Sequence, residues 1–304
     1  MKIGIIGLGG IARKAYLPIV LNKGDLTPVL CTRNSEILNT IAGKYRIADV
    51  TTSIDGLIDK NIQAAFVHTS TESHFEIVKK LLLNDINVYV DKPISYYYSE
   101  ARELVDLAEK RGKHLFVGFN RRFCPAYAGL NNTGTPGIVL VQKNRTYLPE
   151  EIRSFIFDDF IHVVDTIRFL SPELDDKITV TSNLQDSKLI HVTVQFTGNN
   201  FTAFGMMNRN NGTTEEVVEI MKDGEKYVVN DMDSTRHFCK GEERINRFNV
   251  WDPVLYRRGF VDLINHFLEV IRGNANPLIT SHDALLTHKY CEDIVARIER
   301  SAAP

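Results

Sequence analysis

The sequence is short of the residues on which small stapled or metal-stabilised domains depend. Its 304 residues include only 4 cysteines and 1 tryptophan. Cys31, Cys124, Cys239 and Cys291 lie far apart and form no C-x-x-C pair. The pattern therefore predicts neither a disulfide framework nor a zinc site, and we expect no bound metal.

Long apolar runs and an excess of one charge are also missing. No segment reaches the roughly 18 uncharged apolar residues that a membrane helix needs, and 36 basic side chains face 38 acidic ones. The absence of a basic tract disfavours a partner that is nucleic acid or an acidic membrane surface. The apolar stretch after Lys2 is unlike a signal peptide, because glycines interrupt it and Arg13-Lys14 follow it. We expect a soluble cytoplasmic protein, whose length suggests two domains.

Short apolar runs alternate with helical patterns up to about residue 118. The runs, apolar enough to be strands buried on both faces, lie at 2–6, 26–31, 64–67, 87–90 and 115–117, and the helical patterns at 12–21, 35–44, 71–83 and 99–110. Such alternation is typical of a parallel sheet with right-handed crossovers. This part of the chain therefore predicts a doubly wound α/β domain.

The pattern changes after residue 120. A helical segment at 155–170 precedes period-two strands at 177–181, 189–196, 201–207, 217–221 and 226–230, and two helices, from Asp252-Pro253 to Arg272 and from about His282 to Arg300, end the chain. We therefore predict an α/β protein with a Rossmann domain over residues 1–120. Residues 121–304 would form an α+β domain around a largely antiparallel open sheet.

Gly7-Leu8-Gly9-Gly10-Ile11-Ala12 fits the pattern G-x-G-x-x-G/A between the first strand and the first helix. Such a turn needs glycine for its tight bend, a second glycine where backbone approaches a pyrophosphate, and a small residue where helix meets sheet. The helix N-terminus adds unpaired N–H groups and a positive dipole end. These residues are candidates for binding a dinucleotide, and a merely tight turn is the alternative.

The end of the second strand bears on which dinucleotide binds. An NAD-selective site places Asp or Glu there to bind the ribose 2′-hydroxyl, whereas this sequence has Thr32 with Arg33 beside it. Hydroxyl and guanidinium groups can bind a 2′-phosphate, which a carboxylate would repel. The sequence favours NADP, and NAD is the alternative if Arg33 is a solvated surface residue.

Asp91-Lys92-Pro93 follows the strand at 87–90. In an open α/β sheet, residues beyond the carboxyl ends of the strands face the ligand. Lys92 could stabilise a substrate oxygen as it becomes more negative, and Pro93 would stiffen the turn that aims it. A surface lysine is the alternative.

The helical segment 155–170 supplies the other chemical groups. Asp158, His162 and Asp165 are spaced i, i+4 and i+7, so on an α-helix they share one face. Histidine exchanges protons near neutral pH, and a carboxylate one turn away can orient it. The alternative is a polar stripe that faces water.

Further motifs follow the glycine turn in a fixed order: Thr69-Ser70-Thr71-Glu72-Ser73-His74, Asp91-Lys92-Pro93, Gly118-Phe119-Asn120-Arg121-Arg122-Phe123 and Asp158-Asp159-Phe160-Ile161-His162-Val163-Val164-Asp165. In this order they resemble the Gfo/Idh/MocA oxidoreductases, and most closely the MviM-like subgroup. The resemblance covers nearly the whole chain, including 267–272 and 283–294.

This resemblance implies roles for individual residues. Lys92 would lie by the nicotinamide and the substrate, and Asp158 and His162 would be the other catalytic pair. The residues that it places along the cofactor are Thr69, Ser70, His74, Asp91, Lys92 and Pro93.

The sequence departs from the family pattern at several positions. Asp91 stands where Glu is usual, Ser70 where Pro is usual, Thr71 for Asn and Phe160 for Gly. The interval from Phe123 to Asp158 is short and lacks the Gly-Gly run of many relatives. We therefore expect a shortened substrate loop.

Residues and resemblance together predict hydride transfer between NADP(H) and a secondary alcohol or ketone of a sugar, cyclitol or diol. His162 would accept the hydroxyl proton while Asp158 orients its ring, and Lys92 would stabilise the oxygen. The cofactor carries the hydride chemistry, and the protein positions the reactants.

Alternatives to this function remain open in the sequence. The shortened loop suggests a non-catalytic NADP(H)-binding sensor, which would not need a proton-transfer pair. A DNA-binding repressor is disfavoured because no basic recognition helix stands out. Arg121, Arg122 and Arg145 either lie near the substrate crevice or form surface salt bridges. Relatives commonly associate through the second-domain sheet, so we expect a homodimer there.

Overall fold

The computed structural model describes residues 1–131, 134–175 and 177–302. The chain forms two compact units, each treated separately below. The first unit holds Met1–Gly118 and Phe260–Leu286, and the second holds Phe119–Gly259 and the chain from Thr287 onward. The predicted boundary at 120/121 lies two residues from the first crossing. The assignment of 260–286 to the second domain is corrected, because this segment packs with the first unit.

The first unit contains a six-stranded sheet whose paired strands are all parallel, in the order β3-β2-β1-β4-β5-β6. Its strands are β1 Lys2–Ile6, β2 Thr27–Cys31, β3 Val50–Thr51, β4 Ala64–Val67, β5 Asn87–Val90 and β6 Leu115–Val117. The order reverses at β1 and β4, as in the classic dinucleotide-binding fold. The doubly wound parallel sheet is thus confirmed; only the two-residue β3 escaped the sequence pattern.

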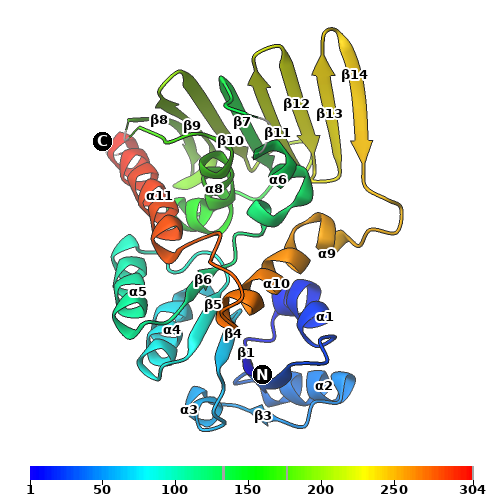
Figure 1. Ribbon diagram of the computed structural model, residues 1–304. Coiled ribbons are helices and arrows are strands. Elements are labelled where there is room, and N and C mark those ends of the chain that lie inside the picture. The colour runs from blue at the N-terminus through cyan, green and yellow to red at the C-terminus, as the bar shows by residue number, and fades with distance from the viewer. Residues whose placement is uncertain (132–133, 176, 303–304) are drawn as a thin grey trace. The chain divides into compact units, whose positions relative to one another are not determined.

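Helices cover this sheet, and Figure 1 shows α4 and α5 side by side along it. The helices are α1 Leu17–Val20, α2 Ser35–Tyr45, α3 Ile54–Ile58, α4 His74–Leu83, α5 Tyr98–Arg111 and α10 Phe260–Ile271, with a π-helical segment at Ala12–Tyr16 and a 3₁₀ turn at Thr71–Ser73. The returning helix α10 buries Phe267, whose ring lies 5.1 Å from that of Phe66 and 5.4 Å from that of Tyr89. These aromatic contacts hold 260–286 to the first unit.

The single helix predicted from Asp252-Pro253 to Arg272 is instead two helices, α9 Val254–Arg257 and α10. Gly259 separates them with a φ of +77°. A Cβ atom there would lie 2.2 Å from the carbonyl oxygen of Asn120, so glycine is needed for the close approach as well as the turn.

The second unit contains an eight-stranded sheet in the order β14-β13-β12-β11-β7-β10-β9-β8. Its strands are β7 Ile138–Asn144, β8 Ile178–Gln185, β9 Lys188–Gly198, β10 Phe201–Asn208, β11 Glu215–Lys222, β12 Glu225–Asn230, β13 Ser234–Cys239 and β14 Glu242–Arg247. All neighbours are antiparallel except β7 and β10. The largely antiparallel sheet is confirmed, but the sequence pattern missed β7, β13 and β14.

One face of this sheet is covered by helices. Figure 1 shows α6 and α8 in front of the strands and α11 at the left of them. The helices of the unit are α6 Pro125–Asn131, α7 Ile152–Phe155, α8 Ile161–Leu170, α9 and α11 Ser281–Ala302, which begins in the first unit, with a 3₁₀ turn at Asn120–Phe123 and a π-helical segment at Ile156–Phe160. Along β9, Val192, Val194 and Phe196 are buried while the residues between them are not, as their alternation predicts.

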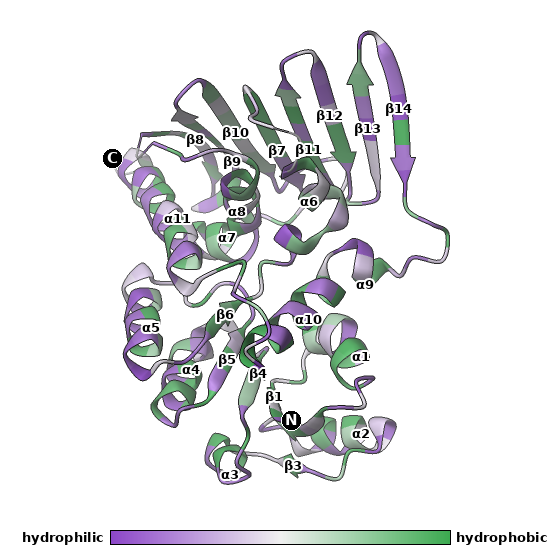
Figure 2. Ribbon diagram, viewed as in Figure 1, coloured by the Kyte–Doolittle hydropathy of each residue, from purple (hydrophilic) through white to green (hydrophobic). Residues whose placement is uncertain are grey.

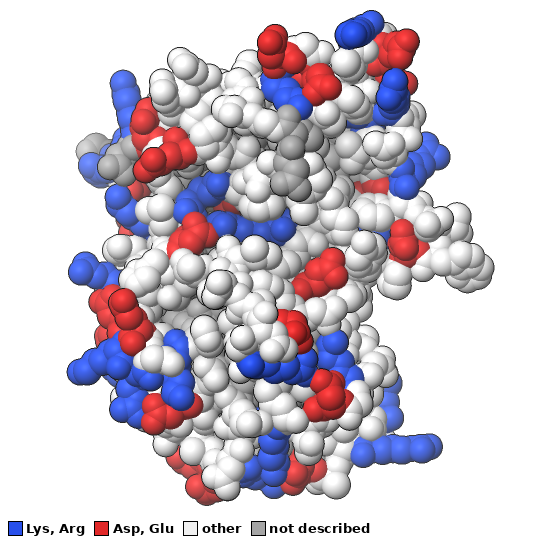
Figure 3. Space-filling model, viewed as in Figure 1, with Lys and Arg blue, Asp and Glu red and all other residues white. Residues whose placement is uncertain are grey.

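The sheet ends in the polar edge strand β14, where all six residues are exposed. Figure 2 shows β14 as hydrophilic apart from one band, which is Ile245. Charged side chains on an edge strand discourage pairing with another chain. Figure 3 shows Lys and Arg interspersed with Asp and Glu over the face in view. Within the described ranges, no helix is both long and apolar enough to cross a membrane.

Candidate cofactor and catalytic sites

The glycine turn lies at the carboxyl end of β1, beside that of β4. Gly7 has a φ of +83°, and its N–H donates to the Cys31 carbonyl at 2.9 Å. A Cβ at Gly7 would lie 2.7 Å from the backbone nitrogen of Thr69, so the approach of the two strand ends requires glycine. The fold therefore requires glycine at position 7 whether or not a ligand binds.

Gly9 and Gly10 have a different environment. A Cβ atom at either position would meet nothing within 4 Å, and helical backbone begins at Gly10. Open space before a helix N-terminus, at the edge where strand order reverses, fits a dinucleotide pyrophosphate. Ala12 is fully buried at the helix–sheet contact, and Ile11 is 42% exposed. The turn thus fits the nicotinamide cofactor that its sequence predicts.

The residues after β2 bear on the choice between NAD and NADP. Thr32 is half-buried, and its N–H donates to the Thr51 carbonyl at 3.4 Å. Arg33 is exposed, and its guanidinium has no ion pair or hydrogen bond within the described part of the chain. The Asn34 side chain caps α2 by accepting from the Ile37 N–H at 3.0 Å. No carboxylate occupies the strand end itself.

The Asp91-Lys92-Pro93 turn is held by buried and partly buried hydrogen bonds. Asp91 Oδ1 accepts from the Lys92 N–H at 2.9 Å and from the Tyr16 hydroxyl at 3.4 Å, and Tyr16 lies 2.8 Å from the Tyr89 hydroxyl. Burial raises the pKa of Asp91 and raises that of Tyr16 well above its usual range. Asp91 therefore anchors the turn that carries Lys92.

His74 joins two of the predicted cofactor segments. Its Nδ1 lies 2.8 Å from the Pro93 carbonyl, and its Nε2 lies 3.1 Å from the Thr69 carbonyl. Burial lowers the pKa of His74, so the neutral ring has one N–H to donate, and the shorter distance assigns it to Pro93. Ser70, which lies between Thr69 and His74 in the sequence, is exposed. His74 thus holds the segment at Thr69 and the turn at Pro93 together.

The second unit brings charged groups to one edge of its sheet. Strands β7 and β10 are parallel, so their carboxyl ends meet at the same edge. Lys143 lies near the end of β7, Arg145 follows that strand, and Arg209 follows β10. All three pair with the buried Asp159: Arg145 Nε at 2.9 Å, Arg209 Nη2 at 3.0 Å, and Lys143 Nζ at closer range.

A second ion pair adjoins this cluster. Arg121 binds Glu216 with two hydrogen bonds, of 2.8 and 2.6 Å, and the Tyr127 hydroxyl donates to the same carboxylate at 3.0 Å. Glu216 is the cross-strand neighbour of Lys143. Arg121 also places its Nη1 2.8 Å from Nδ1 of His162. Buried hydrogen bonds and neighbouring strands therefore link His162 to the charged cluster.

The Arg121 contact fixes which nitrogen of His162 carries a proton. An arginine can only donate hydrogen bonds, so Nδ1 must accept, and the neutral ring then carries its proton on Nε2. The sequence predicted a carboxylate, Asp158, as the group that orients this ring. Arg121 lies at Nδ1, so His162 presents a donor at Nε2, and the orienting role of Asp158 stays a prediction.

Cations outnumber carboxylates in this buried region. Arg121, Lys143, Arg145 and Arg209 face Asp159 and Glu216, an excess of two positive charges among the described residues. Burial, helped by repulsion from Arg121, lowers the pKa of Lys143 to about 7. Burial alone would raise the pKa of both carboxyls, but Arg121 lowers that of Glu216 to about 2, and Lys143 and Arg145 lower that of Asp159 well below its usual range.

The helix that carries Asp158 and His162 is not regular. The predicted helix 155–170 comprises α7, the π-helical segment Ile156–Phe160 and α8. The i to i+5 hydrogen bonds of the π-helical turn change the regular α-helical spacing on which the shared face of Asp158 and His162 was predicted, and the shared face stays a prediction. Asp159 turns to the buried cations, whereas Asp158 is half-buried.

Asp165 has a structural role. It accepts three hydrogen bonds from the Arg122 guanidinium, the shortest of 2.7 Å, and one of 3.0 Å from the Thr287 hydroxyl. Arg121 and Arg122 are therefore in buried or nearly buried ion pairs, and the surface alternative is wrong for both. Arg145 is one-third exposed.

Sequence reasoning missed four charged residues of the second site: Lys143, Asp159, Arg209 and Glu216. Lys143 had a detectable signal, because it continues the alternation of the buried Val139 and Val141 along β7. A lysine at a core-facing position is rarely buried unless it is paired, so it predicts a buried carboxylate partner. The partners themselves come from other segments and have no such signal.

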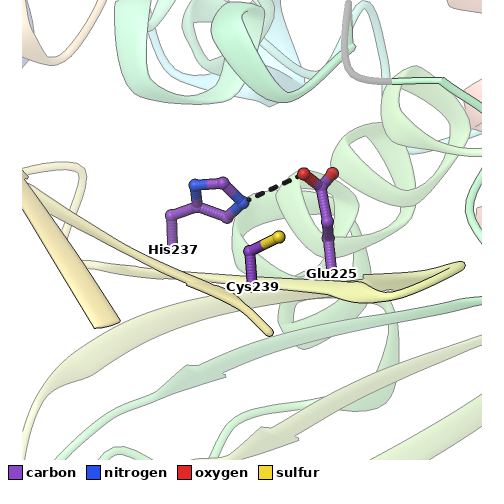
Figure 4. Close-up of side chains that lie close together, drawn as sticks. All are labelled: Glu225, His237 and Cys239. Atoms are coloured by element: carbon purple, nitrogen blue, oxygen red, sulfur yellow. Dashed lines mark ion pairs between the residues drawn. The ribbon is translucent and has the colours of Figure 1, made fainter. Parts of the chain in front are cut away.

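One other cluster has metal-ligand chemistry. Figure 4 shows Glu225, His237 and Cys239, whose ligand atoms lie within 4.8 Å of one another on β12 and β13. The Glu225 carboxylate is already paired with the Lys222 ammonium at 2.7 Å, and the His237 ring stacks on Tyr227 at 4.2 Å. A metal ion would need the Glu225 carboxylate, which is already paired with Lys222. We therefore assign no metal to these residues.

Comparisons with known proteins agree with this architecture. Residues 1–119 match the family described as "Oxidoreductase family, NAD-binding Rossmann fold", and residues 125–239 match "YceM-like, C-terminal domain". The fold and the glycine turn thus define a nicotinamide-dependent dehydrogenase.

Relatives with full-length similarity identify the family. YceM of Salmonella typhimurium (strain LT2) is 32% identical over 299 residues, 96% of each chain. The dehydrogenase MviM from Clostridium difficile has a TM-score of 0.93 at 34% identity, covering 98% of this chain and 99% of that one. A Gfo/Idh/MocA family oxidoreductase from Vibrio cholerae has a TM-score of 0.93 at 31% identity, covering 99% of each chain. The chain belongs to the Gfo/Idh/MocA family of oxidoreductases.

A more distant relative has a named substrate. An inositol 2-dehydrogenase from Salmonella paratyphi B is 24% identical over 186 residues, which is 57% of this chain and 55% of that enzyme.

Proposed function

We propose that the protein transfers hydride reversibly between NADP(H) and a secondary alcohol or ketone of a sugar, cyclitol or diol. The observation that carries the proposal is the open backbone at Gly9 and Gly10 before a helix N-terminus, which fits a dinucleotide. The inositol 2-dehydrogenase relative supports a polyol substrate. The exposed guanidinium of Arg33, with Thr32 beside it, supports NADP over NAD.

Each named residue has a distinct part in this proposal. The cofactor, when bound, accepts or supplies the hydride. Because the proton on Nε2 makes His162 a donor, we assign the proton transfer predicted for His162 to Lys92, which takes a proton from the substrate hydroxyl during oxidation and returns it during reduction. His162 donates a hydrogen bond from Nε2 to the same oxygen, because Arg121 occupies Nδ1. We assign Asp158 to the same catalytic site, as the family resemblance implies.

The proposed cofactor-binding residues lie in the glycine turn and in the segments that contain Thr69 and Lys92. Backbone at Gly7 to Ala12 would hold the pyrophosphate. Thr69, Ser70 and His74 would lie along the cofactor together with the Asp91-Lys92-Pro93 turn, which His74 and Asp91 hold in shape.

The experiment is a turnover assay with NADP(H) and NAD(H) against a panel of sugars, cyclitols and diols. We expect NADP-linked turnover that falls about 10²–10³-fold in both Lys92→Ala and His162→Ala. Turnover within a factor of a few in both variants would overturn the catalytic roles. Cofactor binding without any turnover would leave a regulatory NADP(H)-binding protein instead.

We also propose that a second copy covers the sheet face opposite Val139 and Val141. Half-buried Leu140, Phe204 and Met206 lie on that face, where Phe204 pairs with Leu140. Apolar side chains left partly exposed on a sheet suit an interface with a second copy. Light scattering on the purified protein should give twice the chain mass, and a monomer at all concentrations would exclude the dimer.

A further inference from the structure

The cluster around Asp159 has more positive charge than its own carboxylate can balance. Lys143, Arg145 and Arg209 share that single carboxylate. The neighbouring pair of Arg121 and Glu216 is balanced within itself. The excess therefore belongs to the three cations at the ends of β7 and β10.

Glu216 also attracts Lys143 and Arg145, but its carboxylate is already paired with Arg121, so two positive charges remain unbalanced among these six residues. Glu215, the nearest in sequence to Glu216, accepts from the side-chain amides of Asn144, Gln142 and Asn211 at 2.8, 3.1 and 3.2 Å. Burying charge without a counter-charge is unfavourable, so such a cluster is stable only with a further anion or a lost proton.

The cluster has unused hydrogen-bond donors. Arg209 is only 5% exposed, yet its Nε has no hydrogen-bond partner among the described residues. Arg145 uses Nε and Nη2 on Asp159, which leaves Nη1 without a partner there, and its side chain is 34% exposed. The cluster thus has a buried donor and a guanidinium that reaches solvent.

The cluster is also joined to the proposed catalytic histidine. Asp159, in the π-helical segment, lies three residues before His162, which is in the first turn of α8. On the sheet, Lys143 neighbours Glu216, which holds Arg121, which in turn holds His162. A substrate whose reacting oxygen meets His162 could therefore extend toward Lys143 and Arg145 within the same unit.

We propose that Lys143, Arg145 and Arg209 bind an oxyanion group of the substrate, so that the enzyme acts on a sugar acid or an anionic sugar derivative rather than a neutral polyol. This inference rests on the proposed hydride transfer for its substrate, but not for the binding of the anion. Guanidinium and ammonium groups bind both carboxylate and phosphate oxygens. Binding would supply the missing counter-charge.

The test compares matched probes by calorimetry and thermal unfolding, with the full-length protein and NADP present. The probes are gluconate, glucose 6-phosphate and glucose. We expect one of the two anions to bind at least about tenfold more tightly than glucose, and the identity of that anion distinguishes carboxylate from phosphate.

Two variants locate the binding. Arg145→Gln, at a partly exposed position, should weaken anion binding about tenfold and leave glucose unaffected. Arg236→Gln is the matched control, because Arg236 is a 44%-exposed arginine of the same sheet, paired with Glu243 at 2.5 Å. It should bind the anion as the unmodified protein does.

The outcomes separate this inference from the proposed function. Equal binding of glucose and both anions, or unchanged anion binding in Arg145→Gln, overturns the oxyanion site even if neutral polyols are oxidised. Arg145-dependent anion binding without turnover of any probe supports the site and counts against hydride transfer.

Discussion

Nη1 of Arg121 lies 2.8 Å from Nδ1 of His162, and this distance sets the chemistry of the histidine. Because arginine only donates, the ring must accept at Nδ1 and carry its proton on Nε2. We expect the ¹⁵N spectrum of His162 to show an unprotonated Nδ1, with the signal assigned by its loss in His162→Ala. A protonated Nδ1 at neutral pH would contradict the role given to Arg121.

Replacement of Arg121 tests the same contact through activity and stability. Arg121→Met should destabilise the fold by about 3–5 kcal/mol, because it leaves the buried Glu216 unpaired. Arg121→Lys retains the charge but loses the fork that reaches both partners. We expect Arg121→Lys to remain folded with a reduced kcat and an altered pH profile. An unaltered profile would limit Arg121 to a structural role.

The two kinds of glycine in the first turn should respond differently to alanine. Gly7→Ala should destabilise the first unit, because its φ is +83° and the new Cβ would lie 2.7 Å from backbone. Gly9→Ala has open space and should unfold at an unchanged temperature while binding the cofactor about tenfold more weakly. Thermal unfolding with and without NADP measures both effects. Equal cofactor binding in Gly9→Ala and the unmodified protein would remove the pyrophosphate from this turn.

The cofactor preference is expected to depend on Arg33. A charge-assisted hydrogen bond contributes about 1.5–3 kcal/mol, so Arg33→Ala should weaken NADP binding by about 10–100-fold and leave NAD binding nearly unchanged. Arg102→Ala is the control, because Arg102 is another exposed arginine of the first unit. Equal losses for both cofactors, or none, would count against the NADP assignment.

The charge excess around Asp159 predicts opposite effects from neighbouring substitutions. Asp159→Asn leaves the buried Lys143 and Arg209 and the partly exposed Arg145 without their carboxylate and should destabilise the protein by about 3–5 kcal/mol. Lys143→Met removes one surplus cation and should leave the free energy of unfolding unchanged or raise it. Chemical denaturation at pH 7 compares the two. A larger loss in Lys143→Met than in Asp159→Asn would show that the cluster is not overcharged.

The pKa of Lys143 predicts a pH dependence of stability. Its pKa is about 7 in the folded protein against an ordinary value of 10.5. Between these values the unfolded chain binds more protons, so the contribution of Lys143 to stability rises with pH from about 7 to about 10.5. The difference between the unmodified protein and Lys143→Met should therefore change across this window. A constant difference would place the folded pKa near its ordinary value.

Anion binding should show the opposite trend with pH. A bound oxyanion stabilises the protonated form of Lys143. The other charged groups that act on Lys143 are Asp159, Glu216, Arg121 and Arg145. We expect its affinity to fall as pH rises through about 7, and this dependence to disappear in Lys143→Met.

Local patterns in the sequence determined the first half of the fold. Strand and helix periodicity, with the glycine turn after β1, specified a parallel sheet and a dinucleotide-type turn, because both depend on residues close together in the chain. The same is true of β8 to β12, whose alternating residues show the face that is buried. The two-residue β3 and the wholly exposed β14 have too little apolar pattern to be detected.

Only the tertiary structure decided the return of 260–286 to the first unit and the partners of the buried charges. Phe267 is an ordinary apolar position until its contacts with Phe66 and Tyr89 are known. Similarly, Asp159 meets Lys143 and Arg209, 16 and 50 positions away, only when the ends of β7 and β10 come together. A motif marks which residues can do chemistry, but hydrogen bonds made between distant segments decide which atom of His162 carries the proton.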